Sequence, residues 1–580
     1  MSFLQAIFNS VSPYFNLWMS AEIVTALYEG RGRQAIFTLV AITLFGNLFI
    51  EFGGVLLGNI VSLQLEKLNN NESLAFNRKT LSLDYDKLED PEIRTLRRRI
   101  KENGCINNYG IVQMRETFNL FMSSVVKVVF SLIFFIEMTT KIIAVGFHWL
   151  GIVFLVGMIL FAVLQNIWMY KYGIKRSEYW RKIGDMMLAE NRIGRGTNST
   201  GMDDRIYLQA DMIRKLSEKI NRDHLNAFAE GNAYDFKMGV PNSILSWIST
   251  LFNYLLVCFY CVIGAFPVGN VIKYTGYLGR FMTDLSTLIA VPLRAFKENE
   301  QFLKLYLDYF DIPNDMYQGS LAVEKRSDKK YDIEFRNVSF KYAGSENYAL
   351  KNINLTFKVG ERLAVVGMNG SGKTTFIKLM CRLYDPTEGE IYMNDFNVRK
   401  YDYRQYLDLF SVVFQDYSLL ALPLGNNVSS AATWNAEKAL RCLREVGFGE
   451  RYDNMPKGLE TPIYKNFDDE GVNVSGGEAQ KIALARALYK DAPFIILDEP
   501  TAALDPIAEA EIYAKFDEIV GDKTAIYISH RLSSCRFCDK IAVFDNGEIV
   551  QVGSHEELLA EENGKYYELW TAQAQYYNKK

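Results

Sequence analysis

The stretch VSGGE at residues 474–478 decides the fold, because of the motifs on either side of it. Upstream, the glycine-rich segment GMNGSGKTT occupies residues 367–375. Downstream, the hydrophobic run FIIL at 494–497 ends in two acids, Asp498 and Glu499. A G-x-x-x-x-G-K-[ST] pattern alone indicates nucleotide binding. The additional SGG element and the acidic strand end restrict the classes of nucleotide-binding protein to which this chain could belong.

The glycine-rich segment has the chemistry of a triphosphate site. Its glycines allow backbone N–H groups to face phosphate, and the helix that follows directs its positive end at the same anion. Lys373 is expected to contact the β- and γ-phosphates of ATP, and the Thr374 hydroxyl to bind Mg²⁺. The alternative is a glycine-rich turn without a ligand. The other loop residues expected at the nucleotide are Gly367, Asn369, Gly370, Ser371 and Gly372.

The two acids follow a predicted buried strand, at the strand end where ligands bind in open α/β sheets. Asp498 suits Mg²⁺, held through water. Glu499 suits the base that polarises the attacking water. Phosphoryl transfer depends mainly on positioning and charge stabilisation, so one well-held carboxylate is sufficient. For Glu499 the alternative is a solvated acid.

In this order, the motifs resemble the ATP-binding cassette of ABC transporters over about the last 250 residues. The resemblance implies five further roles. Gln415 would be the Q-loop residue that senses Mg²⁺ and the γ-phosphate, and His530 the switch histidine at the γ-phosphate. Asp505 would lie at the interface between cassettes. Tyr342 would stack on adenine, and Thr375 would contact the α-phosphate. Gln415, His530 and Tyr342 could each instead be an ordinary residue of a strand or its end.

Ser475 is a good helix N-cap residue, and a cap alone is one interpretation of the SGG element. The other is that Gly476 and Gly477 leave N–H groups exposed at a positive helix end. In the family this element contacts ATP held by the opposite cassette, so two cassettes sandwich two ATP molecules. Glu478 stands where glutamine is more usual. The full motif set in one chain favours a homodimer of half-transporters, and a heterodimer stays open.

The first half of the chain is predicted to span a membrane six times. Residues 142–170 and 238–272 contain no Asp, Glu, Lys or Arg, and each exceeds the ~20 residues that cross a bilayer. Buried core helices are the alternative, but such helices rarely reach this length and have polar faces. The remaining spans are predicted at 4–28, 34–61, 116–136 and 274–294.

The loops indicate the orientation. Short links are predicted near 29–33, 138–141 and 265–273, and long cation-rich links at 63–110 and 171–237. Since cation excess marks the cytoplasmic side, both termini and the cassette are expected in the cytoplasm of a multi-pass plasma-membrane protein.

This pattern also resembles the exporter-type ABC membrane domain. That resemblance implies coupling helices on the cassette near Asn103–Tyr109 and Thr200–Tyr207. The apolar run begins at Met1, so neither the family's lead-in helix nor an attached peptidase is expected.

The predicted fold is a membrane all-α bundle of six transmembrane helices with long cytoplasmic extensions, followed by an α/β P-loop nucleotide-binding domain. Its predicted parts are the membrane domain at 1–313, a linker at 314–330 and the cassette at 331–580. A net charge of -4 gives no reason to expect a nucleic-acid partner. The seven cysteines lack the spacing of zinc ligands.

The expected function is ATP-driven export of a solute by alternating access. The solute is expected to be an amphipathic peptide, drug or lipid. Acids within the spans, including Glu51 and Glu137, would suit a cationic one. The alternatives are a cassette that acts only as an ATP-regulated gate or sensor, a soluble ABC ATPase, and an importer.

Overall fold

The computed structural model describes residues 2–107, 110–197, 205–324, 331–358, 360–466, 468–499, 523–529 and 532–578. The chain divides into two compact units. One comprises residues 1–83 and 91–313, and the other comprises residues 84–90 and 314–580. The short segment 84–90 therefore belongs with the C-terminal part of the chain.

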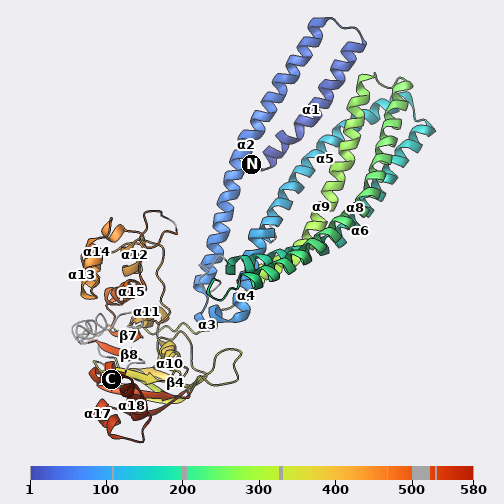
Figure 1. The fold of residues 1–580 in the computed structure, drawn as a ribbon. Coiled ribbons are helices and arrows are strands. Elements are labelled where there is room, and N and C mark those ends of the chain that lie inside the picture. The colour runs from blue at the N-terminus through green and yellow to red at the C-terminus, as the bar shows by residue number, and fades with distance from the viewer. Residues whose placement is uncertain are drawn as a thin grey trace. The chain divides into compact units, whose positions relative to one another are not determined.

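The first unit is built from long helices (Figure 1). Within it, α6 packs along α8, α5 along α9, and α1 along α2 and α9. The helices are α1 (Ser2–Tyr28), α2 (Arg33–Ser82), α4 (Pro91–Asn107), α5 (Ile111–Val145), α6 (Trp149–Thr197), α8 (Ala210–Val262) and α9 (Gly269–Phe310).

Four described helices are long and apolar enough to cross a membrane: α2, α5, the 149–173 part of α6, and α8. Helices α1 and α9 occupy the other two predicted spans. One predicted boundary is wrong. The link expected at 138–141 lies inside α5, and the chain turns at Gly146, whose φ of +99° is strained for residues with a Cβ.

The apolar side chains of the predicted spans are largely exposed in this unit. On α2, Phe37, Phe45 and Phe49 are each at least 70% exposed. Exposed apolar surface on this scale marks a lipid or protein contact and not the core of a soluble protein.

The coupling helix expected at Asn103–Tyr109 is wrongly placed. Residues 103–107 are the end of α4, in the first unit, and residues 108–109 lie outside the described residues. A different short helix, α3 (Tyr85–Glu89), belongs to the cassette unit. Of the second expected segment, Thr200–Tyr207, only residues 205–207 are described.

The described part of the cassette unit contains two sheets. A four-stranded antiparallel sheet has the order β2-β1-β4-β5, and a six-stranded sheet has the order β10-β9-β3-β8-β7-β6. The strands are β1 (Ile333–Phe340), β2 (Leu350–Phe357), β3 (Arg362–Gly367), β4 (Glu388–Met393), β5 (Phe396–Asn397), β6 (Phe410–Val413), β7 (Phe494–Asp498), β8 (Thr524–Ile528), β9 (Lys540–Asp545) and β10 (Glu548–Gly553).

Helices follow these strands and cover the sheets (Figure 1). The α-helices are α10 (Lys373–Met380), α11 (Tyr403–Leu407), α12 (Leu424–Ser429), α13 (Ala436–Glu445), α14 (Gly449–Asp453), α15 (Gly476–Lys490), α17 (His555–Ala560) and α18 (Lys565–Asn578). This is the α/β architecture that the sequence predicts.

The parallel pairing of β3, β8, β7 and β6 positions the site. Asp498 at the end of β7 lies opposite Ile528 of β8, and Val413 of β6 lies opposite Leu497. Because parallel strands present their carboxyl ends at one edge, the segments after these four strands converge there. Those segments contain the phosphate loop, Gln415, Glu499 and the chain leading to His530.

Candidate functional site

The phosphate loop takes its shape from two glycines. A Cβ at Gly367, where φ is +152°, would lie 2.2 Å from the Phe544 carbonyl oxygen. A Cβ at Gly372, where φ is +103°, would lie 2.5 Å from a methyl carbon of Leu350. Both positions therefore require glycine. Gly372 is the N-cap of α10, so the loop runs directly into a helix N-terminus.

The loop carries polar groups that fit a bound anion. Lys373 is 6% exposed, and its ammonium donates to the Gly367 and Met368 carbonyl oxygens, each at 3.0 Å. Burial lowers the pKa of Lys373, against the opposing effect of Glu499 and Asp498. Ser371 Oγ is buried without a hydrogen-bond partner among the described residues. An unpaired buried hydroxyl is unfavourable, and a phosphate oxygen would satisfy it.

Thr374 and Asp498 form the candidate metal site. Thr374 Oγ1 donates to Asp498 Oδ2 at 3.1 Å. Burial raises the pKa of Asp498 to about 6, with Glu499 adding to the rise and the Thr374 hydrogen bond opposing it. Hydroxyl and carboxylate oxygens are ligands that suit Mg²⁺, and a divalent cation would favour the ionised carboxylate. The two residues therefore fit the predicted ion.

Among the described residues, Gln415, Ile528 and Gln480 hold Glu499. Its carboxylate accepts from Gln415 Nε2 at 3.1 Å, its N–H donates to the Ile528 carbonyl at 3.0 Å, and its carbonyl accepts from Gln480 at 3.3 Å. Its backbone φ is +53°, which is unusual for a residue with a side chain. Such strained conformations cluster at functional sites. The structure thus brings together Gln415 and Glu499, which are far apart in sequence.

Tyr342 lies beside the phosphate loop. Its hydroxyl and Thr375 Oγ1 are 2.9 Å apart. Its ring meets the ring of Tyr384 edge-on at 5.5 Å, and the Lys378 ammonium lies 5.9 Å from the centre of each ring. The predicted adenine-stacking residue therefore belongs to a cluster of aromatic rings around one cation.

This aromatic cluster continues into α3, which sequence reasoning did not find. Glu89 accepts hydrogen bonds from Tyr384 at 2.5 Å and Tyr85 at 3.0 Å, and its carboxylate lies 3.3 Å from Lys378 Nζ. Burial opposes ionisation, but these contacts hold the pKa of Glu89 below its usual range. Pro91 gives a sequence signal for the segment, since proline favours the first position of a helix and separates α3 from α4.

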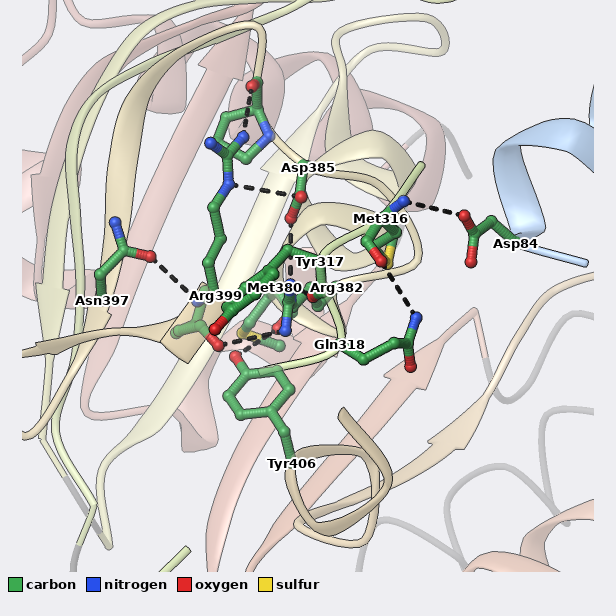
Figure 2. Close-up of polar contacts among 12 residues, drawn as sticks. Asp84, Met316, Tyr317, Gln318, Met380, Arg382, Asp385, Asn397, Arg399 and Tyr406 are labelled. Carbon is green, nitrogen blue, oxygen red and sulfur yellow. Dashed lines mark hydrogen bonds and ion pairs between the residues drawn. The ribbon is translucent and has the colours of Figure 1, made fainter. Parts of the chain in front are cut away.

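The segment after Pro313 is fastened to the cassette near α10 (Figure 2). The Arg382 side chain, fully buried, donates to the Tyr317 carbonyl and pairs with Asp385 at 3.3 Å. Asp84 accepts from the Met316 N–H at 2.9 Å. A fully buried arginine needs such partners. Residues 314–318 thus link the segment containing α3 to Arg382, just after the helix that follows the phosphate loop.

The SGG element lies at the start of α15, and Ser475 is the N-cap residue of this helix, as predicted. Ser475 Oγ accepts from the Glu478 N–H at 3.2 Å, and the Glu478 carboxylate accepts from the Ser475 N–H at 2.8 Å. This reciprocal pair is a capping box. Glu478 also pairs with Arg451 at 3.0 Å. The unusual glutamate therefore has a structural role, while Ser475 and Gly476 stay exposed.

Two predicted site residues, Asp505 and His530, lie outside the described residues. Asn369 lies in the exposed part of the phosphate loop, and Gly370, at φ +79°, has open space around its Cβ position. Among the described residues, no group of three or more His, Cys, Asp or Glu could hold a metal ion. The candidate ion site therefore has Thr374 and Asp498 in contact, whereas Gln415, the third residue predicted at the ion, donates to Glu499.

Comparison with known proteins gives consistent similarities. The ABC transporter family model matches residues 350–502. The subtilin transport ATP-binding protein SpaT of Bacillus subtilis is 28% identical over 96% of this chain and 88% of its own length. The ATP-dependent lipid A-core flippase of Haemophilus influenzae is 38% identical, but over only 51% of each chain. A bacterial Atm1-family ABC exporter solved with ATP bound shares the fold, with a TM-score of 0.73 and 20% identity over 99% of this chain and 98% of that one.

Proposed function

We propose that the chain is an ABC transporter that exports a solute across the plasma membrane by ATP-driven alternating access. The observation that carries the proposal is the convergence of the phosphate loop, the Thr374–Asp498 pair and the Gln415–Glu499 pair at one sheet edge. That edge has what phosphoryl transfer needs: an anion cradle, a cation site and a positioned carboxylate.

Each residue of the nucleotide site that the structure describes has a role in this proposal. Lys373 leaves the loop carbonyls to contact the β- and γ-phosphates, and Ser371 Oγ donates to phosphate. Thr374 and Asp498 would hold Mg²⁺, which would neutralise charge on the phosphates when bound. Glu499 orients and polarises the attacking water. Gln415, released from Glu499, senses the γ-phosphate.

The contribution of Glu499 is tested by comparing Glu499→Gln with wild type in lipid nanodiscs. We expect Glu499→Gln to bind ATP with unchanged affinity and to lose turnover by about 100-fold or more. A variant with normal turnover would remove Glu499 from the mechanism. Asp332→Asn, at an exposed acid in the same cassette, is the matched control.

The functional unit in this proposal is a dimer of half-transporters. Ser475, Gly476 and Gly477 lie exposed or half-exposed at the N-terminus of α15, with the capping box leaving the helix end open to a ligand. A helix N-terminus attracts anions. We assign this end to ATP bound by the other cassette, most simply in a homodimer, with a heterodimer as the second possibility. In this proposal Asp505 lies at the interface between the cassettes, and His530 contacts the γ-phosphate.

The alternative function is a membrane protein whose cassette serves as an ATP-regulated gate or sensor. The Glu499–Gln415 contact favours hydrolysis, because a gate that only binds ATP does not need a positioned carboxylate. ATP turnover that is coupled to solute movement in proteoliposomes supports the exporter. ATP binding without turnover would support the gate.

The solute belongs to the amphipathic peptide, drug or lipid class in this proposal. The relatives are named for unlike solutes, subtilin and lipid A-core, so they leave the class open. The cassette and both termini face the cytoplasm, where ATP is. In this orientation the turn at Gly146 and the α8–α9 link face outward.

A further inference from the structure

The hydroxyl of Tyr417 contacts the SGG element of the same chain. Tyr417 lies two residues after Gln415, and its Oη donates to the Gly476 carbonyl oxygen at 3.1 Å. The contact joins two segments that are 59 residues apart in sequence. The proposed mechanism assigns Gln415 to the ATP of its own cassette and Gly476 to the ATP of the other cassette. Tyr417 therefore lies between groups that serve two different ATP molecules.

The capping box determines which N–H groups at this helix end are left for a ligand. The N–H groups in the first turn of a helix have no partner within the helix. At α15, Ser475 Oγ accepts from the Glu478 N–H, and the Glu478 carboxylate accepts from the Ser475 N–H. Among the described residues, these two bonds leave the N–H groups of Gly476 and Gly477 for an anion.

The Gly477 N–H belongs to the same peptide group as the Gly476 carbonyl. A peptide group is planar and trans, so its C=O and N–H point in opposite directions. A donor that holds the carbonyl therefore also fixes the direction of the N–H. Adjacent glycines have a wide choice of backbone conformation, so an anchor from outside the helix restricts this peptide most. The Tyr417 hydroxyl is such an anchor.

Tyr417 is itself held in a defined position. Its N–H donates to the Phe414 carbonyl at 3.3 Å, which closes a turn directly after β6. Arg486 of α15 donates to the Ser418 carbonyl at 3.3 Å and to the Asn427 carbonyl at 2.8 Å. The Tyr417 ring packs against the hydrophobic core of the cassette. The backbone on both sides of Tyr417 is therefore bonded, and its ring is packed.

The catalytic carboxylate of the same chain is held by other contacts. Glu499 accepts from Gln415 through its side chain and from Gln480 through its carbonyl, and neither bond uses the Tyr417 hydroxyl. Loss of that hydroxyl should therefore leave Glu499 of the same chain in place. Its effect should appear at the ATP that the SGG element contacts.

We propose that Tyr417 is a positioning residue for the ATP held by the opposite cassette. Its hydroxyl orients the Gly476–Gly477 peptide, whose N–H donates to a phosphate oxygen of that ATP in a charge-assisted bond. Tyr417 touches no nucleotide in this role. The inference rests on the proposed dimer of half-transporters and adds one positioning residue to each shared ATP site.

The test uses doubly tagged heterodimers in nanodiscs that contain one intact ATP site. One chain carries Ser475→Asp and supplies the phosphate loop of that site, and the other carries Lys373→Ala and supplies its SGG element. Tyr417→Phe, which keeps the ring but removes the donor, is introduced into one chain at a time. In the Lys373→Ala chain it should lower ATP turnover about fivefold. In the Ser475→Asp chain, whose SGG element is already inactive, it should change turnover little.

Tyr489→Phe is the matched control. The Tyr489 hydroxyl also bonds to backbone, since it accepts from the Asn435 N–H at 2.9 Å, but it lies in the last turn of α15, away from the SGG element. Its loss should change turnover little in either chain. The control thus separates a general loss of one buried hydroxyl contact from an effect on the peptide that faces the opposite ATP.

The position of the loss decides the outcome. Equal loss with Tyr417→Phe in either chain would make Tyr417 a residue that only stabilises the cassette. A loss confined to the Ser475→Asp chain would assign its effect to Gln415 of the same chain. Either result, or no loss in any chain, would overturn the inference while the dimer stands. A heterodimer that is inactive before Tyr417 is changed would contradict the dimer itself, and the inference with it.

Discussion

Asp498 should destabilise the cassette when no cation is bound, and Asp498→Asn should relieve that cost. Asp498 is 2% exposed, and burial raises its pKa from 3.8 to about 6. A carboxyl whose folded-state pKa is raised favours the folded state less once it ionises. Stability is therefore lost as pH rises through the interval from about 4 to 6 and stays low above it. The asparagine variant keeps an oxygen that accepts from Thr374 but cannot ionise.

The size of the effect follows from the pKa values. The pKa of Asp498 is about two higher in the folded than in the unfolded state. This difference lowers the free energy of unfolding by about 3 kcal/mol at pH 8 and by about 1.5 kcal/mol at pH 5. For a unit of this size, 1 kcal/mol shifts Tm by about 2–4 °C. Asp498→Asn should therefore raise the Tm of the cassette by up to about 10 °C at pH 8 and by about half as much at pH 5.

The assay is thermal unfolding of the detergent-purified full chain with EDTA present, at both pH values. Asp332→Asn, at an exposed acid, should change Tm little and serves as the control. Addition of Mg²⁺ and ATP should stabilise wild type and narrow its gap to the variant. A variant no more stable than wild type at pH 8, or an equal gap at the two pH values, would refute the reasoning.

Three further outcomes are expected. Arg382→Met should destabilise the cassette by about 3 kcal/mol in chemical unfolding, because it leaves Asp385 and the Tyr317 carbonyl without their buried partner. Arg399→Met, at a more exposed arginine, is the control and should cost less than about 1 kcal/mol. Glu89→Gln and Tyr384→Phe should show a coupling of about 1 kcal/mol or more in a double-mutant cycle of cassette stability. Because the contacts hold the pKa of Glu89 below its usual range, that coupling should be present at pH 7 and fade only when the pH falls below the usual carboxyl range. Tyr342→Leu should raise KM for ATP severalfold with kcat little changed, while Tyr342→Phe should match wild type; an equal loss in both variants would exclude stacking and implicate the hydroxyl contact with Thr375.

The nucleotide site was largely predictable because its chemistry lies in contiguous motifs. The pattern at 367–375 requires glycines at positions whose φ values are positive in the structure, and the acids at 498–499 end a strand that is buried throughout. The position of the acids at a sheet edge was predictable because the hydrophobic run at 494–497 indicated a buried strand that ends at them. The roles of His530 and Asp505 stay predictions, since both residues lie outside the described residues.

The contacts that depend on tertiary structure were not predictable. The short acidic helix α3 has no periodicity to indicate that Glu89 meets Tyr384, some 295 residues later in the chain. The end of α5 was misplaced because the charge-free run that begins at residue 142 was taken as a new span. In the structure Lys141 lies 3.7 Å from Glu137 one helical turn earlier, and the chain turns at Gly146. The cationic solute was suggested by acids counted along the chain, and the structure pairs Glu137 with Lys273.

The most direct test of the account mixes two inactive variants. Lys373→Ala removes the phosphate contact from one half-site, and Ser475→Asp keeps a good N-cap residue while placing negative charge against the opposite half-site. Each variant alone should lack ATP turnover. A doubly tagged heterodimer of the two contains one site with both halves intact, so it should regain up to about half of wild-type turnover. A heterodimer as inactive as its parents would contradict ATP sites shared between two chains.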